Sequence, residues 1–396
     1  MKRFSNVPFL PLLPALIVIV LIIGLANGPA FRELTPLGPP SIPSDNSQAV
    51  DELGYPQLDD PKVQLGKVLF YDNRLSGDAS ISCADCHSDE FGWTDGADLC
   101  RGYNGTAHWR NCQTIINSAY FAKLFWDGAS KSLEAQAVSA ASGAVAGNGE
   151  RDMMEERLRQ VPQYVAMFRE VFGTPWPDLE DAWRAIAAYE RTLIQTDTPY
   201  DRYLRGDLTA LSNDAIAGME IFTGKGKCIQ CHDGPLLTDE KYYNLGVPEN
   251  PAFETDQLRQ ITFRYEQYAK GVTEEIYRTV KTDLGLYYVT KRTVDMGKFR
   301  TPMLRYLLYT APYMHNGAFY TLEEVVEFYN DGGRDDQIMV NFDFGTKTDL
   351  IRPLGLTATE QRQLVAFLES TSGEEIKTER PILPEYGSID DTMGSK

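Results

Sequence analysis

The residues most suited to chemistry in this chain form the pattern Cys-x-x-Cys-His, which occurs twice. The two copies are Cys83, Ala84, Asp85, Cys86 and His87, and Cys228, Ile229, Gln230, Cys231 and His232. Two cysteines at this spacing can each form a thioether with one porphyrin, and the adjacent histidine then lies where it can ligate the iron. A zinc knuckle or a redox dithiol would need a second Cys/His cluster or a βαβ pattern, which the sequence lacks. The motifs therefore predict two covalently attached c-type haems with His87 and His232 as axial ligands.

Helical signals dominate the segments that must position these motifs. Asp60 and Pro61 form a cap followed by a first turn, and apolar residues keep helical spacing from Leu179 to Leu193. A capping box at Thr357 and Glu360 begins another helix. No long alternation of apolar and polar residues indicates extended strands. The fold class is therefore expected to be mainly α.

The sequence also predicts how the chain is divided. Residues 1–30 combine Lys2 and Arg3 with an uncharged apolar stretch, which is typical of an export segment, and a cleaved signal peptide and a retained membrane anchor remain alternatives. Residues 31–58, rich in Pro, Ser and Asp, are expected to be a flexible leader. Two haem domains are expected at 59–205 and 206–385, followed by a tail at 386–396. The mature protein is expected in the periplasm, either free or tethered to the inner membrane.

The charge balance restricts the partners. The formal net charge is −18 at pH 7, and an acidic surface repels phosphate, which argues against nucleic acid. A small basic redox protein fits such a surface better.

Several other segments resemble the bacterial di-haem cytochrome c peroxidase and MauG family, and the resemblance spans nearly all of the mature chain. The matching stretches are Leu69 to Ser76, Phe125 to Gly128, Leu133 to Gln136, Asp197 to Leu204, Phe299 to Pro302 and Thr310 to Gly317. The resemblance implies two cytochrome c-like domains, an N-terminal haem that reacts with hydrogen peroxide, a C-terminal haem that relays electrons, and a calcium ion between them. It also implies that Trp126 lies between the haems and relays electrons. The alternative is that Trp126 is an aromatic residue packed in the core. The implied calcium ligands are Asn111, Thr310 and Pro312.

The sixth ligand of the C-terminal haem is expected to be Tyr329. Thr321 and Glu324 form a capping box, and Tyr329 shares the apolar face of the helix that follows. The family places its axial residue here, methionine in the ordinary peroxidases and tyrosine in the MauG-like enzymes. A phenolate stabilises higher oxidation states of iron, whereas a thioether raises the potential. The alternatives are a packed core tyrosine or a methionine ligand from Met296, Met303, Met314 or Met339.

The acid expected above the N-terminal haem is missing. Cleaving peroxide needs a group that moves a proton from one oxygen to the other, and the family uses a glutamate beyond the tryptophan. The matching position in this sequence is Ala146. Gln136 matches a distal glutamine of the MauG-like enzymes, and Glu150 or Asp152 could supply the acid if the loop refolds.

His108 lies in the segment that carries a displaceable distal histidine in the ordinary peroxidases. It is interpreted either as a haem ligand or distal acid-base group, or as an exposed loop residue. Cys100 and Cys112 bracket it and are the cysteines left over from the haem motifs, so in an oxidising compartment they are expected to form a disulfide. Such a bridge stabilises a fold by roughly 3 kcal/mol. His315 is expected to organise the space near the C-terminal haem.

These features predict a periplasmic di-haem oxidoreductase that reduces hydrogen peroxide at the His87 haem, with electrons from a small periplasmic cytochrome c or cupredoxin. Two alternatives remain, a MauG-like enzyme that oxidises a protein side chain such as tryptophan, and a non-enzymatic electron-transfer cytochrome. Gly226 stands where MauG has a relay tryptophan, which argues against an identical MauG route. Many family members dimerise, so a homodimer is also considered.

Overall fold

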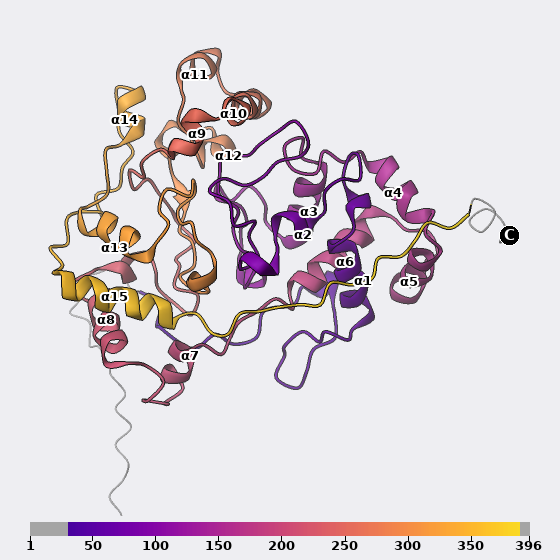
Figure 1. Ribbon diagram of the computed structural model, residues 1–396, viewed down its shortest axis with the longest axis horizontal. Coiled ribbons are helices and arrows are strands. Elements are labelled where there is room, and N and C mark those ends of the chain that lie inside the picture. Colours follow the sequence, from indigo (N-terminus) through magenta and orange to yellow (C-terminus); the bar gives the residue numbers. More distant parts are fainter. Residues whose placement is uncertain (1–30, 389–396) are drawn as a thin grey trace, which may run out of the picture.

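The computed structural model describes residues 31–388, so the predicted export segment at 1–30 and residues 389–396 of the predicted tail lie outside the described residues. The described chain is mainly helical, as predicted, with two short strands that pair antiparallel, β1 (Tyr242–Tyr243) and β2 (Phe299–Arg300). Two groups of helices lie side by side in Figure 1, and a smaller third group lies at the top of the view. Within residues 31–388, no helix has both the length and the hydropathy that crossing a membrane requires.

The first group of helices comes from the N-terminal half of the chain. Its members are α1 (Pro61–Phe70), α2 (Cys83–Cys86), α3 (Leu133–Ser142), α4 (Arg151–Arg159), α5 (Pro162–Phe172) and α6 (Leu179–Glu190). Helix α1 begins where the Asp60 side chain accepts hydrogen bonds from the amides of Lys62 and Val63. It crosses α6 at Gly66, where an added Cβ would lie 1.8 Å from the carbonyl oxygen of Ala185. Glycine therefore lets the two backbones touch at the centre of the first hydrophobic core.

The second group repeats this crossing. Its members are α7 (Pro199–Leu204), α8 (Asn213–Thr223), α13 (Leu322–Asn330) and α15 (Ala358–Ser370). Helix α15 begins at the predicted capping box of Thr357 and Glu360. It packs against α8 at Gly218, where an added Cβ would lie 1.9 Å from the carbonyl oxygen of Gln363. Tyr200 of α7 is fully buried in this second core, although the predicted boundary at residue 205 assigns α7 to the first domain.

Each of the two main groups also contains one copy of the same unit, a loop followed by a helix. The backbone follows the same path in both copies. Each copy has residues of positive φ around a turn that is closed by an antiparallel bridge, and each ends at a helix capped by a hydroxyl side chain. The corresponding pairs are Leu124 and Tyr313, Phe125 and Met314, Trp126 and His315, Gly128 and Gly317, Ser130 and Phe319, Ser132 and Thr321, and Ala140 and Tyr329. The two helices that follow these loops, α3 and α13, are therefore structural counterparts.

The third group, at the top of Figure 1, covers the segment between residues 100 and 112. Its helices are α9 (Pro251–Thr255), α10 (Gln257–Ala269), α11 (Glu274–Thr279), α12 (Tyr287–Thr290) and α14 (Gln337–Asn341), whose Ile338 is buried in the same hydrophobic cluster. Arg259 of α10 donates from Nη1 to the carbonyl oxygens of Cys100 (3.2 Å) and His108 (2.5 Å). The hydroxyl oxygen of Thr262 accepts a hydrogen bond from the amide of Ala107 at 3.3 Å. Helix α10 thus holds the backbone of this loop in place.

The segments at both ends of the described chain cross between the two main groups. Leu37 is 4% exposed and packs with Leu236 and Met303, so residues 31–58, predicted to be a flexible leader, are held by packing at this point. After α15 the chain runs back along the first group, as the yellow segment in Figure 1 shows. There the carbonyl oxygen of Ile376 accepts a hydrogen bond from Nε1 of Trp93 at 2.8 Å. Both crossings tie the two halves together.

Candidate active site

Both Cys-x-x-Cys-His motifs line one continuous cavity of about 610 Å³, to which both main helix groups contribute. This volume is typical of a cofactor site. The predicted haem residues that line the cavity are Cys83, Cys86, His87, Cys228, Cys231, His232 and Tyr329. The structure thus brings the two predicted attachment sites to one interior space.

The two motif histidines are oriented in the same way. Nδ1 of His87 lies 3.1 Å from the carbonyl oxygen of Trp93, and Nδ1 of His232 lies 2.9 Å from that of Leu237. A ring nitrogen that donates to a carbonyl fixes the tautomer and leaves Nε2 with a free electron pair. Burial lowers the pKa of both imidazoles, which favours the neutral form that ligates iron. Both residues therefore fit the role of an axial haem ligand.

The motif cysteines are placed for thioether formation. Cys83 and Cys86 begin and end the single turn of α2, whereas Cys228 begins a single 3-10 turn and Cys231 directly follows it. Within residues 31–388, these four are free of disulfide bonds. Burial raises the pKa of Cys86 and of Cys228 to about 12, so both are neutral thiols. Each motif therefore presents two unpaired sulfurs to the cavity, as covalent attachment of two haems requires.

Tyr329 faces the cavity from α13, which begins at the predicted capping box of Thr321 and Glu324. Burial raises the pKa of its phenol, and the thiols of Cys231 and Cys228 act in the same direction. This influence of the motif cysteines indicates that the phenol lies near the second attachment site. In the absence of a metal the phenol is neutral, and coordination to iron would displace its proton.

The four rival methionines differ in their position. Met303 and Met314 line the cavity. Met296 is buried in the hydrophobic cluster of the third group, and Met339 is 60% exposed. The structure therefore leaves two of the four methionines as rivals to Tyr329.

Trp126 lies in the first repeated loop and lines the cavity. Its Nε1 donates to the carbonyl oxygen of Asn111 at 2.9 Å, and its own carbonyl oxygen accepts from the amide of Arg300 at 2.8 Å. The edge of its ring faces His315, with 6.5 Å between the ring centroids, and His315 stacks on Phe299 at 3.6 Å. Trp126 is thus a fixed aromatic side chain that reaches the same cavity as both motifs.

Asn111, Thr310 and Pro312, the predicted calcium ligands, all line the cavity. The side-chain nitrogen of Asn111 donates to the carbonyl oxygens of Ala97 (3.2 Å) and Asp98 (3.3 Å), which leaves its carboxamide oxygen for another partner. Neutral oxygen donors of this kind suit a hard cation. All three residues line the same cavity, and their role as calcium ligands stays a prediction.

Gln136 on α3 and Ala146 in the loop that follows both line the cavity. Glu150 lies at the surface, where its side chain caps α4 by accepting from the amide of Met153 at 2.9 Å. Asp152 is exposed in the first turn of the same helix. Since α4 begins at this point, neither carboxyl is turned toward the cavity. The loop therefore does not refold to bring Glu150 or Asp152 into the position expected for the missing acid.

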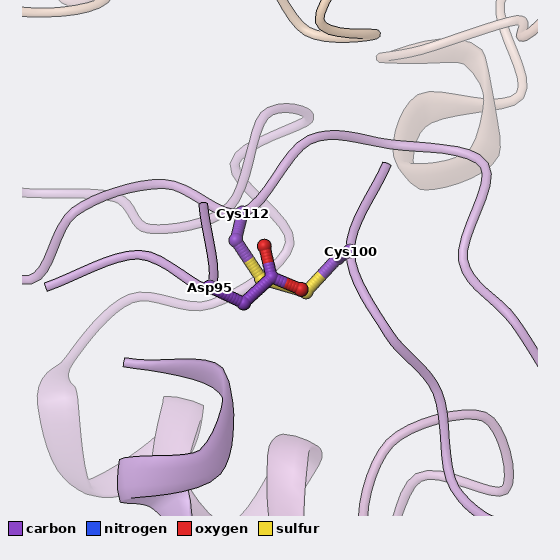
Figure 2. A group of neighbouring side chains, drawn as sticks. All are labelled: Asp95, Cys100 and Cys112. Carbon is purple, nitrogen blue, oxygen red and sulfur yellow. A yellow bond between two sulfur atoms is a disulfide. The ribbon is translucent and has the colours of Figure 1, made fainter. Parts of the chain in front are cut away.

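His108 lies on the loop between Cys100 and Cys112, whose sulfurs are bonded to each other (Figure 2). Its ring lines the cavity and is tilted against that of Trp109, with 5.6 Å between the centroids. Burial lowers the pKa of His108 to about 4, with a smaller contribution from nearby arginines, so the ring is uncharged at neutral pH. This placement favours a distal role over that of an exposed loop residue.

Asp95 lies beside the disulfide in Figure 2, and the three side chains are close enough together to resemble a metal site. The two sulfurs are bonded to each other, however. The Asp95 carboxylate accepts hydrogen bonds from the amides of Arg101 (2.8 Å) and Ala97 (3.2 Å). Asp95 therefore holds the loop rather than a metal ion.

Arg110 forms a buried ion-pair network that no sequence motif marks. Its Nη1 pairs with Asp127 at 2.8 Å and its Nη2 with Asp283 at 3.0 Å, while Nε1 of Trp109 also donates to Asp283 at 2.9 Å. The network joins the disulfide loop, the loop of Trp126 and the third helix group. Because its members are far apart in the sequence, their spacing gives no signal.

Glu190, at the end of α6, is a second cavity residue that no motif marks. It is 4% exposed, and burial raises the pKa of its carboxyl to about 8. Glu190 follows Ile186 by about one helical turn, so both side chains lie on the face of α6 that lines the cavity. This spacing is the one signal in the sequence that could have identified Glu190 as a cavity residue.

Comparison with known proteins gives the family. The model for the Di-haem cytochrome c peroxidase family matches residues 60–209. The cytochrome-c peroxidase IdrP1 of Pseudomonas sp. (strain SCT) is 49% identical over 378 residues, which cover 95% of each chain. This chain belongs to the di-haem cytochrome c peroxidase family. The IdrP1 of Denitromonas iodatirespirans is 53% identical over 352 residues, which cover 88% of each chain.

A solved structure adds a MauG-like relative. It is a MauG-like protein associated with microbial copper homeostasis, which matches with a TM-score of 0.68 and 29% identity over 85% of this chain and 94% of its own. Family membership makes this chain a peroxidase with haem c cofactors, and the two motifs account for them. The alternative of a non-enzymatic electron carrier therefore does not hold.

Proposed function

We propose that this peroxidase reduces hydrogen peroxide at the haem bound by His87, with electrons relayed through a second haem ligated by His232 and Tyr329. The observation that carries the proposal is the correspondence of Ala140 with Tyr329 in the repeated loop and helix, because both residues line the cavity. A phenol oxygen can ligate iron, whereas the methyl group of Ala140 cannot. The first haem would then keep an open face, and the second would be closed on both faces.

The proposal includes two haem domains, each with one motif. The matching helix crossings at Gly66 and Gly218 support this division, as does the repeated loop. The contacts of Tyr200 argue for a domain boundary before α7 rather than at residue 205.

The side chains around the open site have separate roles in this proposal. The haem held by Cys83, Cys86 and His87 would supply an iron that binds peroxide and exchanges electrons. Gln136 can orient peroxide by hydrogen bonds, but an amide does not transfer protons near neutral pH. His108, with a pKa of about 4, is a weak base there. Trp126 provides an aromatic side chain of fixed orientation for electron passage between the two sites.

The partners follow from charge and from the family. A small periplasmic cytochrome c or cupredoxin is the proposed donor, and the net charge of −18 would attract one with a basic surface. A calcium ion held by Asn111, Thr310 and Pro312 would stabilise the loops beside Trp126. Export to the periplasm is proposed from the apolar segment at residues 1–30.

A MauG-like oxidation of a protein side chain is the second candidate, and Tyr329 favours it. Tyrosine is the axial residue expected in MauG-like enzymes, and the MauG-like structure is 29% identical to this chain. Gly226, which stands where MauG has its relay tryptophan, lines the cavity and offers no aromatic ring for electron transfer. Peroxide reduction is therefore the preferred proposal.

The test is a comparison of spectra and turnover. In the ferric protein we expect one high-spin signal from the open site and one low-spin signal from the closed site. With a reduced small cytochrome as donor, peroxide should be consumed at two electrons for each molecule. Two low-spin signals together with no peroxide consumption would contradict the proposal. Oxidation of a tryptophan in a partner protein, without oxidation of the cytochrome, would favour the MauG-like candidate.

A further inference from the structure

Glu190 is a buried carboxyl group that lines the haem cavity without a hydrogen-bond partner for one of its oxygens. The residue is 4% exposed, and its Oε2 has no partner among residues 31–388. After burial itself, the charge of Glu190 is the next largest influence on the pKa of the Cys83 thiol, which it raises. Glu190 therefore lies near the first haem attachment site, on a helix that packs against α3.

The second half of the chain has an apolar residue at the corresponding position. The crossings at Gly66 and Gly218 pair Ala185 of α6 with Gln363 of α15. Counting along both helices from there pairs Ile186 with Leu364 and Glu190 with Leu368, and all four line the cavity. Leucine is therefore sufficient to fill this position beside a haem, so packing alone does not require a carboxyl group in the first half.

The arginine next to Glu190 does not offset the effect of burial on the pKa of its carboxyl group. Arg191 follows it in the sequence, but its Nη2 pairs with Glu134 of α3 at 2.6 Å. Burial raises the pKa of Glu190 to about 8; Arg191 opposes this shift and Glu134 adds to it. The carboxyl group is therefore protonated at neutral pH, and the side chain that carries this proton lines the cavity.

Other carboxyl groups that line the cavity are less suited to proton transfer. Asp127 and Asp283 are paired with Arg110, and its charge holds the pKa of Asp283 below the usual range against the effect of burial. Glu266 pairs with Lys270 at 3.4 Å. Glu249 is the rival, because burial raises its pKa to about 7. It also lines a second, smaller pocket with Trp109 and His315, on the side of the third helix group.

We propose that Glu190 is the catalytic acid that transfers protons to peroxide in this cavity, in place of the acid missing at Ala146. The proposal rests on the proposed function. As the O–O bond breaks, the hydroxyl of Glu190 donates its proton to the oxygen that leaves as water. The carboxylate then accepts the proton from the remaining peroxide oxygen, so Glu190 ends neutral. Two electrons from the donor protein and two protons from solvent reduce that oxygen to a second water, which balances H2O2 + 2 e⁻ + 2 H⁺ → 2 H2O.

The test compares four variants of the two-haem protein with the wild type by stopped-flow mixing with hydrogen peroxide. Glu190→Gln keeps the shape of the side chain without the acid, and Glu190→Leu gives the first half the residue of the second half. Both should slow the reaction by about a hundred- to ten-thousand-fold. Glu180→Gln is the matched control, because Glu180 lies on the same helix and pairs with Arg151 at the surface. Neither Glu180→Gln nor Glu249→Gln should slow it.

A second readout does not depend on turnover. The infrared spectrum of the resting ferric protein should contain the carbonyl band of a protonated carboxylic acid that disappears in Glu190→Gln and persists in Glu180→Gln. A third readout is the pH dependence of the reaction with peroxide. The wild-type reaction should slow as the pH rises above about 8, and Glu190→Gln should lose this dependence.

The possible results separate the two proposals. A fast wild type with an equally fast Glu190→Gln and Glu190→Leu overturns the role of Glu190 and leaves peroxide reduction intact. A large loss in Glu249→Gln alone assigns the role to Glu249 and also overturns the proposal. A wild type that does not react with peroxide overturns the proposed function and the inference with it.

Discussion

Ala140 and Tyr329 occupy the same position in two copies of one loop and helix, and both side chains line the haem cavity. Glu190 and Leu368 form a second pair of this kind on α6 and α15. At both positions the first half carries the residue that suits an open, reactive site, and the second half carries the residue that suits a closed electron-transfer site. Two similar haem sites can therefore differ in function through a few side chains.

The first prediction concerns Ala140. In Ala140→Met, a thioether would lie where the phenol of Tyr329 lies in the second half, so it should ligate the iron of the His87 haem. We expect the high-spin ferric signal to become low-spin and the reaction with peroxide to slow. Ala135→Met, at an exposed position on the same helix, is the control and should change neither. A high-spin signal that persists in Ala140→Met would show that α3 and α13 do not present these positions to iron in the same way.

The second prediction concerns Tyr329. Replacing it with Phe removes the ligand oxygen, so the low-spin signal of the second haem should become high-spin. Replacing it with Met should keep the signal low-spin and raise the reduction potential of that haem, because an anionic ligand is lost. Potentiometric titration with optical detection measures both. If Tyr329→Phe leaves the spectra unchanged, Met303 or Met314 becomes the expected ligand, since both line the cavity.

The third prediction concerns haem attachment. Protein exported together with the cytochrome c maturation machinery should retain two haems after extraction with acidified acetone, because thioether bonds survive this treatment. Replacing Cys228 and Cys231 with Ser should leave one covalent haem and remove the low-spin signal assigned to the second site. A single haem in the wild type, or haem that extracts freely, contradicts the reading of both motifs.

Local features of the site could be predicted from the sequence, whereas long-range ones could not. The spacing of the haem motifs, the capping box before α13 and the face that carries Tyr329 depend on residues a few positions apart. The network of Arg110 with Asp127 and Asp283, the burial of Glu190 and the anchoring of Leu37 depend on segments that meet only in the folded chain. For the same reason Glu150, close to the loop in sequence, lies outside the cavity, because the first turn of α4 carries it to the surface.

The fourth prediction concerns the ion pair of Arg305 and Asp201. Both side chains are fully buried and share two hydrogen bonds of 2.7 and 2.9 Å. Asp201→Asn leaves the guanidinium buried without its counter-charge, so the free energy of unfolding should fall by about 3–5 kcal/mol. The control is Asp197→Asn, whose partners Arg202 and Arg205 are exposed, and a loss of about 0–1 kcal/mol is expected there. Denaturant unfolding of the haem-loaded proteins measures both, and equal losses would contradict the argument.

The last prediction concerns the position of the missing acid. Ala146 and Glu190 line the same cavity. If Glu190 is the proton donor proposed above, a glutamate at position 146 would serve the same proton transfer. Ala146→Glu should therefore change the reaction of the wild type with peroxide little. In the Glu190→Gln background it should recover most of the expected loss of about a hundred- to ten-thousand-fold, since one positioned acid is then restored. Stopped-flow rates for the wild type, the two single variants and the double variant form a cycle that measures this coupling. If Ala146→Glu accelerates both backgrounds by the same factor, the two positions act independently and Glu190 is not the substitute for the missing acid.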